Sequence, residues 1–156
     1  MRQLVNISKL CVLLVALGTL CNSCSRDMFD DHNITVIKNV LNDICVEWGT
    51  DTFDVSERMD GYDLMEMTED FMMFHDKETG CVISYLFDED GLSASSAVID
   101  EDSGITPDRL LSDYDYVGQL SGKDVYCLKQ KNLFVTSYSV NDEEELKLVV
   151  GMTRFQ

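Results

Sequence analysis

The sequence predicts an α+β fold in which helices cover one face of an antiparallel sheet. Apolar residues recur at helical spacing between positions 34 and 60, and a second helix signal surrounds the single proline. Strand-like runs, bounded by glycines and acidic clusters, follow each helical region. The expected order is therefore two short N-terminal helices, an antiparallel meander, a further helix and three more antiparallel strands.

The first expected element is an amphipathic helix that starts near residue 34. Its apolar positions, at offsets of 3, 7, 10 and 14, are Ile34, Ile37, Leu41, Ile44 and Trp48. Asn33 is a candidate N-cap, and Gly49 is expected to end the helix. The β-branched residues at 35–37 also suit a strand, so this alternative stays open.

A second short helix is expected from Asp51 to Asp60. Asp54 favours the first helical turn, because an acidic side chain interacts well with the positive end of the helix dipole. One face of this helix carries Val55, Met59 and Tyr62. Gly61 is the stop signal.

Three strand-like runs follow, at 71–75, 81–87 and 92–99. The segments between them are acidic and close on Gly80 and Gly91, which is typical of tight turns. These runs predict a three-stranded meander. The segment 62–67 is either a further strand at the sheet edge or a loop.

Thr106-Pro107-Asp108 predicts the start of a helix that runs from Pro107 to about Tyr114, because proline suits the first helical position. Gly118 and Gly122 are expected to interrupt the regular structure after this helix. Three further strands are predicted at 125–129, 133–140 and 146–155. In the last, Leu146, Leu148, Val150 and Met152 alternate with residues that face the other way.

The N-terminus predicts export. A basic start is followed by an uncharged run at 10–20, which is too short to span a bilayer that needs ~20 apolar residues. Cys24 follows the small Ser23, whereas Cys21 follows the bulky Leu20. This segment resembles the lipobox of bacterial lipoproteins, which implies that Cys24 is acylated and becomes the new N-terminus. Ordinary signal cleavage near Ser23 is the alternative.

An acidic tether at 25–32 follows the cysteine. It is similar to the segment that follows the acylated cysteine in lipoproteins of Bacteroides-like bacteria, where such a stretch resembles a surface-export signal. We expect a signal peptide at 1–24, this tether, and one α+β domain at 33–156. The resemblance implies attachment to the outer membrane through the N-terminal lipid, and both the periplasmic and the surface-exposed orientation stay open.

The composition is strongly acidic, with 12 basic and 29 acidic residues and a formal charge of −17. Loss of the first 24 residues, which hold Arg2 and Lys9 but no acid, lowers that charge to −19. Nucleic acids are excluded as partners, since phosphate binding depends on clustered lysine and arginine. Solvated turns are the favoured interpretation of the acidic clusters, and a site that binds a cation or a basic partner is the alternative.

Trp48-Gly49, followed by Val55, Met59 and Tyr62, is similar to a motif of small helix-helix-meander lipoproteins. Those proteins assist outer-membrane assembly. The order of elements also resembles the β-lactamase-inhibitor-protein-like fold. These resemblances imply a binding or assembly role and name no partner.

Few residues suggest chemistry. His75 beside Asp76 is the only candidate acid-base pair, and Cys81 or a serine of 93–96 would be its nucleophile. The favoured interpretation is that His75 is an ordinary polar residue of a strand. Cys45, Cys81 and Cys127 match no zinc spacing and are expected to be buried thiols. The segment 100–105 fails as a calcium loop, because its glycine is misplaced. We predict no metal, no cofactor and no catalytic residue.

Methionine and phenylalanine are enriched around 71–74, so that both faces of this strand are apolar. Met72 and Phe74 belong either to the core or to a patch that binds a partner. The prediction for function is a non-enzymatic module that binds a protein or a glycan. The alternatives are an inhibitor or immunity-like protein that masks a basic partner, and a hydrolase that uses His75.

Overall fold

The computed structural model describes residues 32–100, 105–131, 133–142 and 145–154. The N-terminal helix is described over residues 32–43. The elements after it are α2 (Thr52–Arg58), β1 (Asp63–Met67), β2 (Phe71–His75), β3 (Val82–Asp88), β4 (Gly91–Asp100), α3 (Pro107–Leu110), β5 (Asp115–Leu120), β6 (Lys123–Leu128), the 3-10 turn η2 (Lys129–Lys131), β7 (Leu133–Asp142) and β8 (Glu145–Arg154).

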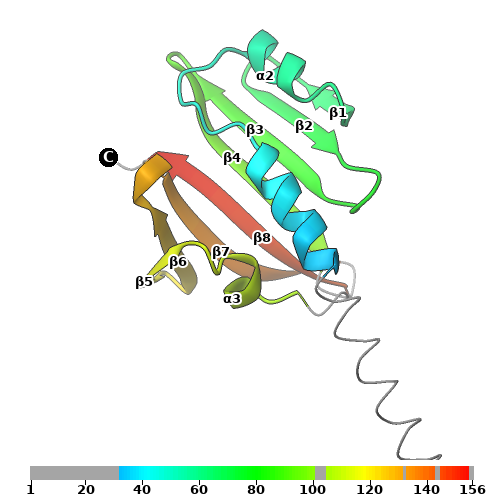
Figure 1. Ribbon diagram of the computed structural model, residues 1–156. Helices are drawn as coiled ribbons and strands as arrows, with labels where there is room; N and C mark the ends of the chain where they lie inside the picture. Colours follow the sequence, from blue (N-terminus) through cyan, green and yellow to red (C-terminus); the bar gives the residue numbers. More distant parts are fainter. Residues whose placement is uncertain (1–31, 101–104, 132, 143–144, 155–156) are drawn as a thin grey trace, which may run out of the picture.

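The eight strands form one antiparallel sheet in the order β1-β2-β3-β4-β8-β7-β6-β5 (Figure 1). Each half of the chain contributes a four-stranded meander preceded by helix. The last strands of the two halves, β4 and β8, pair with each other in the middle of the sheet. The predicted α+β class is therefore confirmed.

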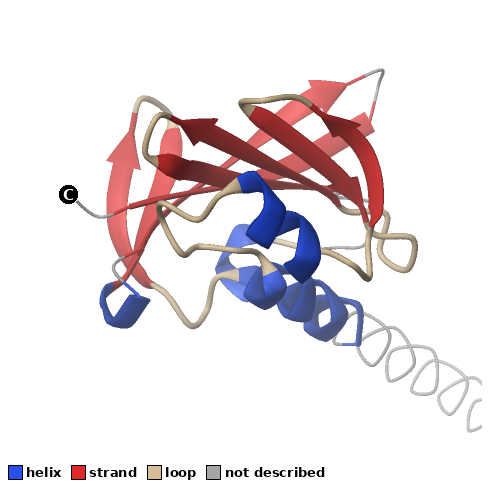
Figure 2. Ribbon diagram, turned by 90° about the horizontal axis from the view of Figure 1, so that it is seen from above, coloured by secondary structure: helices blue, strands red, loops and turns tan. Residues whose placement is uncertain are grey.

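The described helices lie together on one side of the sheet (Figure 2). The core fills the space between these helices and the sheet, and every second residue of the inner strands points into it. In β8 the inward residues are Leu148, Val150 and Met152, which confirms the predicted alternation. The N-terminal helix contributes Ile34, Ile37 and Leu41 to the same core.

The N-terminal helix ends earlier than predicted. Residue 32 is already helical, so Asn33 is not the N-cap, and the helix ends at residue 43 instead of at Gly49. The following segment is held by the sheet: the Gly49 N–H donates to the Leu92 carbonyl at 3.0 Å, and the Leu92 N–H donates to Thr50 at 2.8 Å. These bonds to β4 replace the helical bonds. Trp48 therefore packs on the core from a loop.

Helix α2 agrees with the prediction in position, although it is shorter at both ends. Asp51 is its N-cap, since the Asp51 carboxylate accepts from the Asp54 N–H at 2.9 Å. Val55 and Met59 are fully buried.

The second half differs more from the prediction. Helix α3 ends at Leu110, not near Tyr114, because Leu110 and Leu111 both enter the core and the chain then turns towards β5. Gly118 does not interrupt the regular structure but lies inside β5, at a bulge. The second meander thus has four strands where three were predicted.

The remaining strands lie within two residues of their predicted positions. The ambiguous segment 62–67 is an edge strand, β1, in which every residue is exposed. The three-stranded meander of the prediction corresponds to β2, β3 and β4.

A buried polar cluster joins the segment after the N-terminal helix to the sheet. The Ser95 hydroxyl donates to the Cys45 carbonyl at 2.7 Å, and the Cys45 N–H donates to the Tyr85 hydroxyl at 3.2 Å. The Tyr85 hydroxyl in turn points at the sulfur of Met59, 3.1 Å away. Burial raises the pKa of Tyr85, so its phenol stays neutral. This cluster satisfies backbone groups that would otherwise be buried without a partner.

Gly91 lies against this same segment. An added Cβ would stand 2.5 Å from the Gly49 oxygen, and the φ of +96° already disfavours other residues. Gly122, in the hairpin turn between β5 and β6, has a φ of +79° but no atom within 4 Å of an added Cβ. A side chain at Gly122 would therefore meet backbone strain alone, whereas a side chain at Gly91 would meet both strain and a steric clash with Gly49.

Replacement of Ser95 by Ala should reduce the free energy of unfolding by about 1–2 kcal/mol, because the Cys45 carbonyl would lose its buried donor. Ser96→Ala is the matched control, since Ser96 is half-buried on the opposite side of the strand. Urea denaturation of both variants measures the difference. Equal losses in the two variants would contradict the role given to Ser95.

Gly91→Ala should destabilise the protein by more than about 2 kcal/mol, because strain and the contact with Gly49 add together. Gly122→Ala should cost only about 1 kcal/mol, since it meets strain alone. Thermal unfolding compares the two. A smaller loss for Gly91→Ala than for Gly122→Ala would show that the segment at Gly49 is not held against the sheet.

Candidate functional site

The side of the sheet that faces away from the helices is the candidate site, and we call it the open face. Its residues alternate with the buried core positions along the six strands from β2 to β6 in sheet order. They are half-buried or exposed, apart from the buried Cys127. No described helix lies over them (Figure 2).

Two neighbouring rows of the open face carry no charged side chain. The strand registers align the first row as Phe71, Leu86, Ala94, Thr153, Phe134 and Cys127. They align the second row as Met73, Ser84, Ser96, Gly151, Thr136 and Val125. A solvated sheet face is ordinarily polar, so twelve uncharged positions on so acidic a chain point to a contact surface.

The centre of the second row is unusually small. Ser84, Ser96, Gly151 and Thr136 lie side by side on the four central strands. An added Cβ at Gly151 would come within 3.0 Å of the Thr136 hydroxyl oxygen. Larger side chains, Met73 and Val125, stand at the two ends of this row. A partner can therefore approach the backbone most closely at the middle of the sheet.

Charged side chains lie at the margins of the open face. Lys123 lies over the Tyr138 ring, 4.1 Å from its centroid. Lys147 pairs with Asp100 at 3.9 Å where β8 meets the end of β4. At the edges of the sheet, β1 holds Glu66 opposite Met73 and Asp63, which pairs with Lys77 at 2.6 Å, whereas β5 holds Asp115 opposite Cys127. Both edge strands thus carry acidic side chains.

Met72 and Phe74, the residues predicted for a possible partner patch, are core residues with 0% and 2% exposure. They point towards the helices, and Phe74 packs edge-on against the Tyr85 ring. The patch prediction is therefore wrong for these two side chains. Their neighbours Phe71 and Met73 are half-buried on the open face, so the apolar surface lies one residue away from the predicted one.

The proposed dyad of His75 and Asp76 is not formed. The Asp76 carboxylate accepts from the Thr79 hydroxyl and from the Thr79 N–H, and so it stabilises the turn after β2. Cys81 is buried, and burial raises the pKa of its thiol, which disfavours the reactive thiolate. His75 itself is a half-buried residue at the end of β2, on the open face.

The three described cysteines, Cys45, Cys81 and Cys127, are buried free thiols, as predicted. Within the described ranges, no three His, Cys, Asp or Glu side chains come together as metal ligands would.

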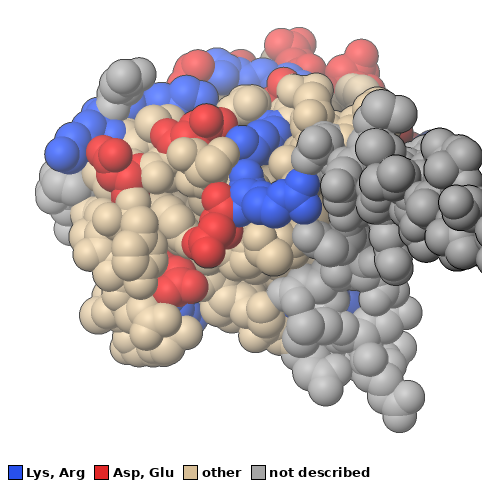
Figure 3. Space-filling model, turned by 60° about the horizontal axis from the view of Figure 1, so that its bottom comes forward, with Lys and Arg blue, Asp and Glu red and all other residues tan. Residues whose placement is uncertain are grey.

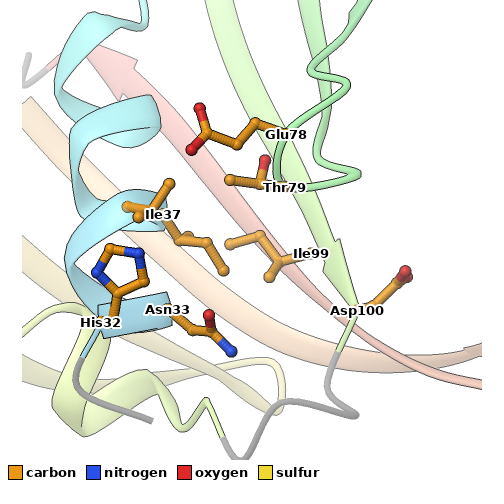
Figure 4. Close-up of a pocket in the computed structure, with 8 residues that line it drawn as sticks. His32, Asn33, Ile37, Glu78, Thr79, Ile99 and Asp100 are labelled. Atoms are coloured by element: carbon orange, nitrogen blue, oxygen red, sulfur yellow. The ribbon is translucent and has the colours of Figure 1, made fainter. Parts of the chain in front are cut away.

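A hollow of about 550 Å3 lies between the N-terminal helix, the turn after β2 and the end of β4 (Figure 4). Ile37 and Ile99 form its apolar part, while His32, Glu78 and Asp100 lie at its rim. The Asp100 carboxylate points away from Glu78 and pairs with Lys147 instead. Among the described residues that line this hollow, the polar groups do not converge on one point.

Basic side chains lie beside acidic ones on the surface shown in Figure 3. The ion pairs between described residues include Lys38 with Asp113 at 3.1 Å and Arg58 with Glu47 at 2.7 Å. The basic side chains in these ion pairs are already bound to carboxylates, so they are less available to an anionic ligand.

Cys24, residues 25–31 of the tether and residues 101–104 lie outside the described residues, whereas His32, the last residue of the predicted tether, belongs to the N-terminal helix. Among the helices that the structure does describe, none is long and apolar enough to cross a membrane.

Comparison of the chain with protein-family models, with curated proteins and with solved structures finds no match.

Proposed function

We propose that this protein is an exported, lipid-anchored and non-enzymatic module that binds a protein partner through the open face. The single observation that carries the proposal is the pair of uncharged rows on the uncovered side of the sheet. If the open face contacted only water, polar residues would be expected in place of Phe71, Met73 and Phe134, because these three side chains expose apolar area to the solvent.

The lipobox-like Cys24 supports the anchor. Seven residues separate it from residue 32, the first described residue of the N-terminal helix. A chain of that length reaches at most roughly 25–30 Å. With Cys24 acylated, the domain stays close to the membrane surface and meets partners that are held there.

A protein partner suits the open face better than a glycan does. Half of the twelve positions in the two uncharged rows are aliphatic, aromatic or methionine side chains, and Ser84, Ser96 and the two threonines supply the only hydroxyl groups. Protein interfaces commonly have such an apolar centre with a charged rim. A sugar requires more hydrogen-bonding groups.

A photoreactive amino acid at Ser96, on the open face, should form covalent adducts with a protein in native membranes. The same group at Glu57, exposed on α2 at the opposite side, is the control and should form none. Immunoblotting detects the adducts. Adducts from Glu57 alone, or from neither position, would contradict a partner site on the open face.

Cys24→Ala should remove the protein from the membrane fraction, because the acylated sulfur is lost. Cys21→Ala is the matched control and should leave the protein in the membrane. Cell fractionation measures both. Continued membrane retention of the Cys24→Ala protein would overturn the lipid anchor.

A further inference from the structure

We infer that β1 is a second docking site, where an extended segment of another protein adds to the sheet as a further strand. In this segment apolar and basic residues alternate. The site goes beyond the proposed function, because the open face takes no part in it. Strand β1 stands first in the sheet order, so β2 occupies one of its sides and no described strand pairs with the other (Figure 1).

The outer side of β1 offers backbone hydrogen-bonding groups. The Thr68 N–H donates to the Phe71 carbonyl at 2.8 Å, where a turn joins β1 to β2. Bonded and non-bonded pairs alternate along an antiparallel ladder, so the preceding residue, Met67, turns its N–H and its carbonyl away from β2. These two groups are available to a strand that adds outside β1.

Large apolar side chains line the same edge. All five residues of β1 are exposed, and Leu64, Met65 and Met67 are 51%, 56% and 51% exposed. Leu64 and Met67 stand opposite the core residues Phe74 and Met72, so they lie on the side of the sheet that the helices cover. They extend the core to an edge where they stay half exposed. Apolar side chains of an added strand would bury them.

The charges on the other side of β1 select basic residues in the added strand. Glu66 stands there opposite Met73, and among the described residues it has no cationic partner. Asp63 is already bound to Lys77 at 2.6 Å. Residues 60–70 hold five acidic and no basic side chains. A lysine or arginine beside Glu66 would therefore form an ion pair across the strands, whereas an acidic strand would be repelled.

A bulge limits where the segment can add. It interrupts the pairing with β2 between Leu64 and Glu66, and bulges commonly protect sheet edges. The other common protections of an edge are lysine and proline, and residues 60–70 contain neither. We therefore place the added strand beside the regular end of β1, at Glu66 and Met67.

The other edge strand, β5, does not offer the same site. On the side that the helices cover, Tyr116 and Gln119 both donate to the Asp124 carboxylate, at 3.3 and 2.8 Å. Tyr116 also packs on the Tyr126 ring, with 5.3 Å between the ring centroids. These side chains are polar and already bound to β6, whereas those at the equivalent positions of β1 are apolar and half exposed.

Fluorescence anisotropy tests the inference, with the full chain in a non-ionic detergent and a labelled peptide that alternates lysine and valine. No binding up to roughly 1 mM protein would overturn the inference. Two further peptides carry N-methyl groups on the lysines or on the valines and keep the charge. One of the two should lose binding, because only alternate residues of a strand turn their N–H groups towards β1. The same affinity for both N-methylated peptides overturns strand addition.

Met67→Pro removes the outward N–H and should weaken binding of the unmodified peptide by at least roughly 10-fold. The sheet should stay intact, since this N–H does not bond to β2. Met67→Val is the matched control, because it keeps the N–H and an apolar side chain, and it should bind as the wild type does. Circular dichroism shows that both variants are folded. Equal binding by the two folded variants overturns the proposed edge site.

Glu66→Lys provides a test that leaves the backbone unchanged. It should weaken peptide binding by at least roughly 10-fold, because the added strand would then place lysine beside lysine. Asp115→Lys makes the same change of charge on β5 and should have a clearly smaller effect. Equal losses in the two variants would mean that the overall charge attracts the peptide, and they would overturn the role given to β1. Absence of adducts from Ser96 would contradict the open face alone.

Discussion

The pairing of β4 with β8 is the interaction on which the rest of the structure depends. It runs from Ala94 opposite Thr153 to Asp100 opposite Lys147, and it joins two meanders that are otherwise separate. Because these strands are the last of their halves, the pairing makes the strand order symmetric about the middle of the sheet. The open face and its uncharged rows exist as one surface only through this contact.

The helices give the sheet its two unlike sides. Isoleucine and leucine side chains of the N-terminal helix, with Val55 of α2 and its C-cap residue Met59, bury one side of the sheet and leave the other bare. Hydrogen bonds among Cys45, Tyr85 and Ser95 hold the connecting segment in place. The core is thus formed on one side of the sheet, and the described helices leave the other side, the open face, uncovered.

Much of the fold could be predicted because strand periodicity is local. Strands β2, β3, β4, β7 and β8 follow runs whose alternation or turn residues are visible in the sequence. Strand β5 was missed because it is an exposed edge with a bulge at Gly118, so its apolar residues do not alternate. The end of the N-terminal helix was misplaced because bonds from Gly49 and Thr50 to β4 decide it. Such bonds join residues about 40 positions apart, and no local pattern records them.

Composition and local periodicity establish the class of fold, the acidic charge and the apolar residues on both sides of strand 71–75. Alternation alone does not say which side a helix will cover. The tertiary structure decided that Met72 and Phe74 enter the core, whereas Phe71 and Met73 belong to the open face. The physical reason is that burial depends on what packs against a strand, and here the packing elements come from residues 32–58 and from α3.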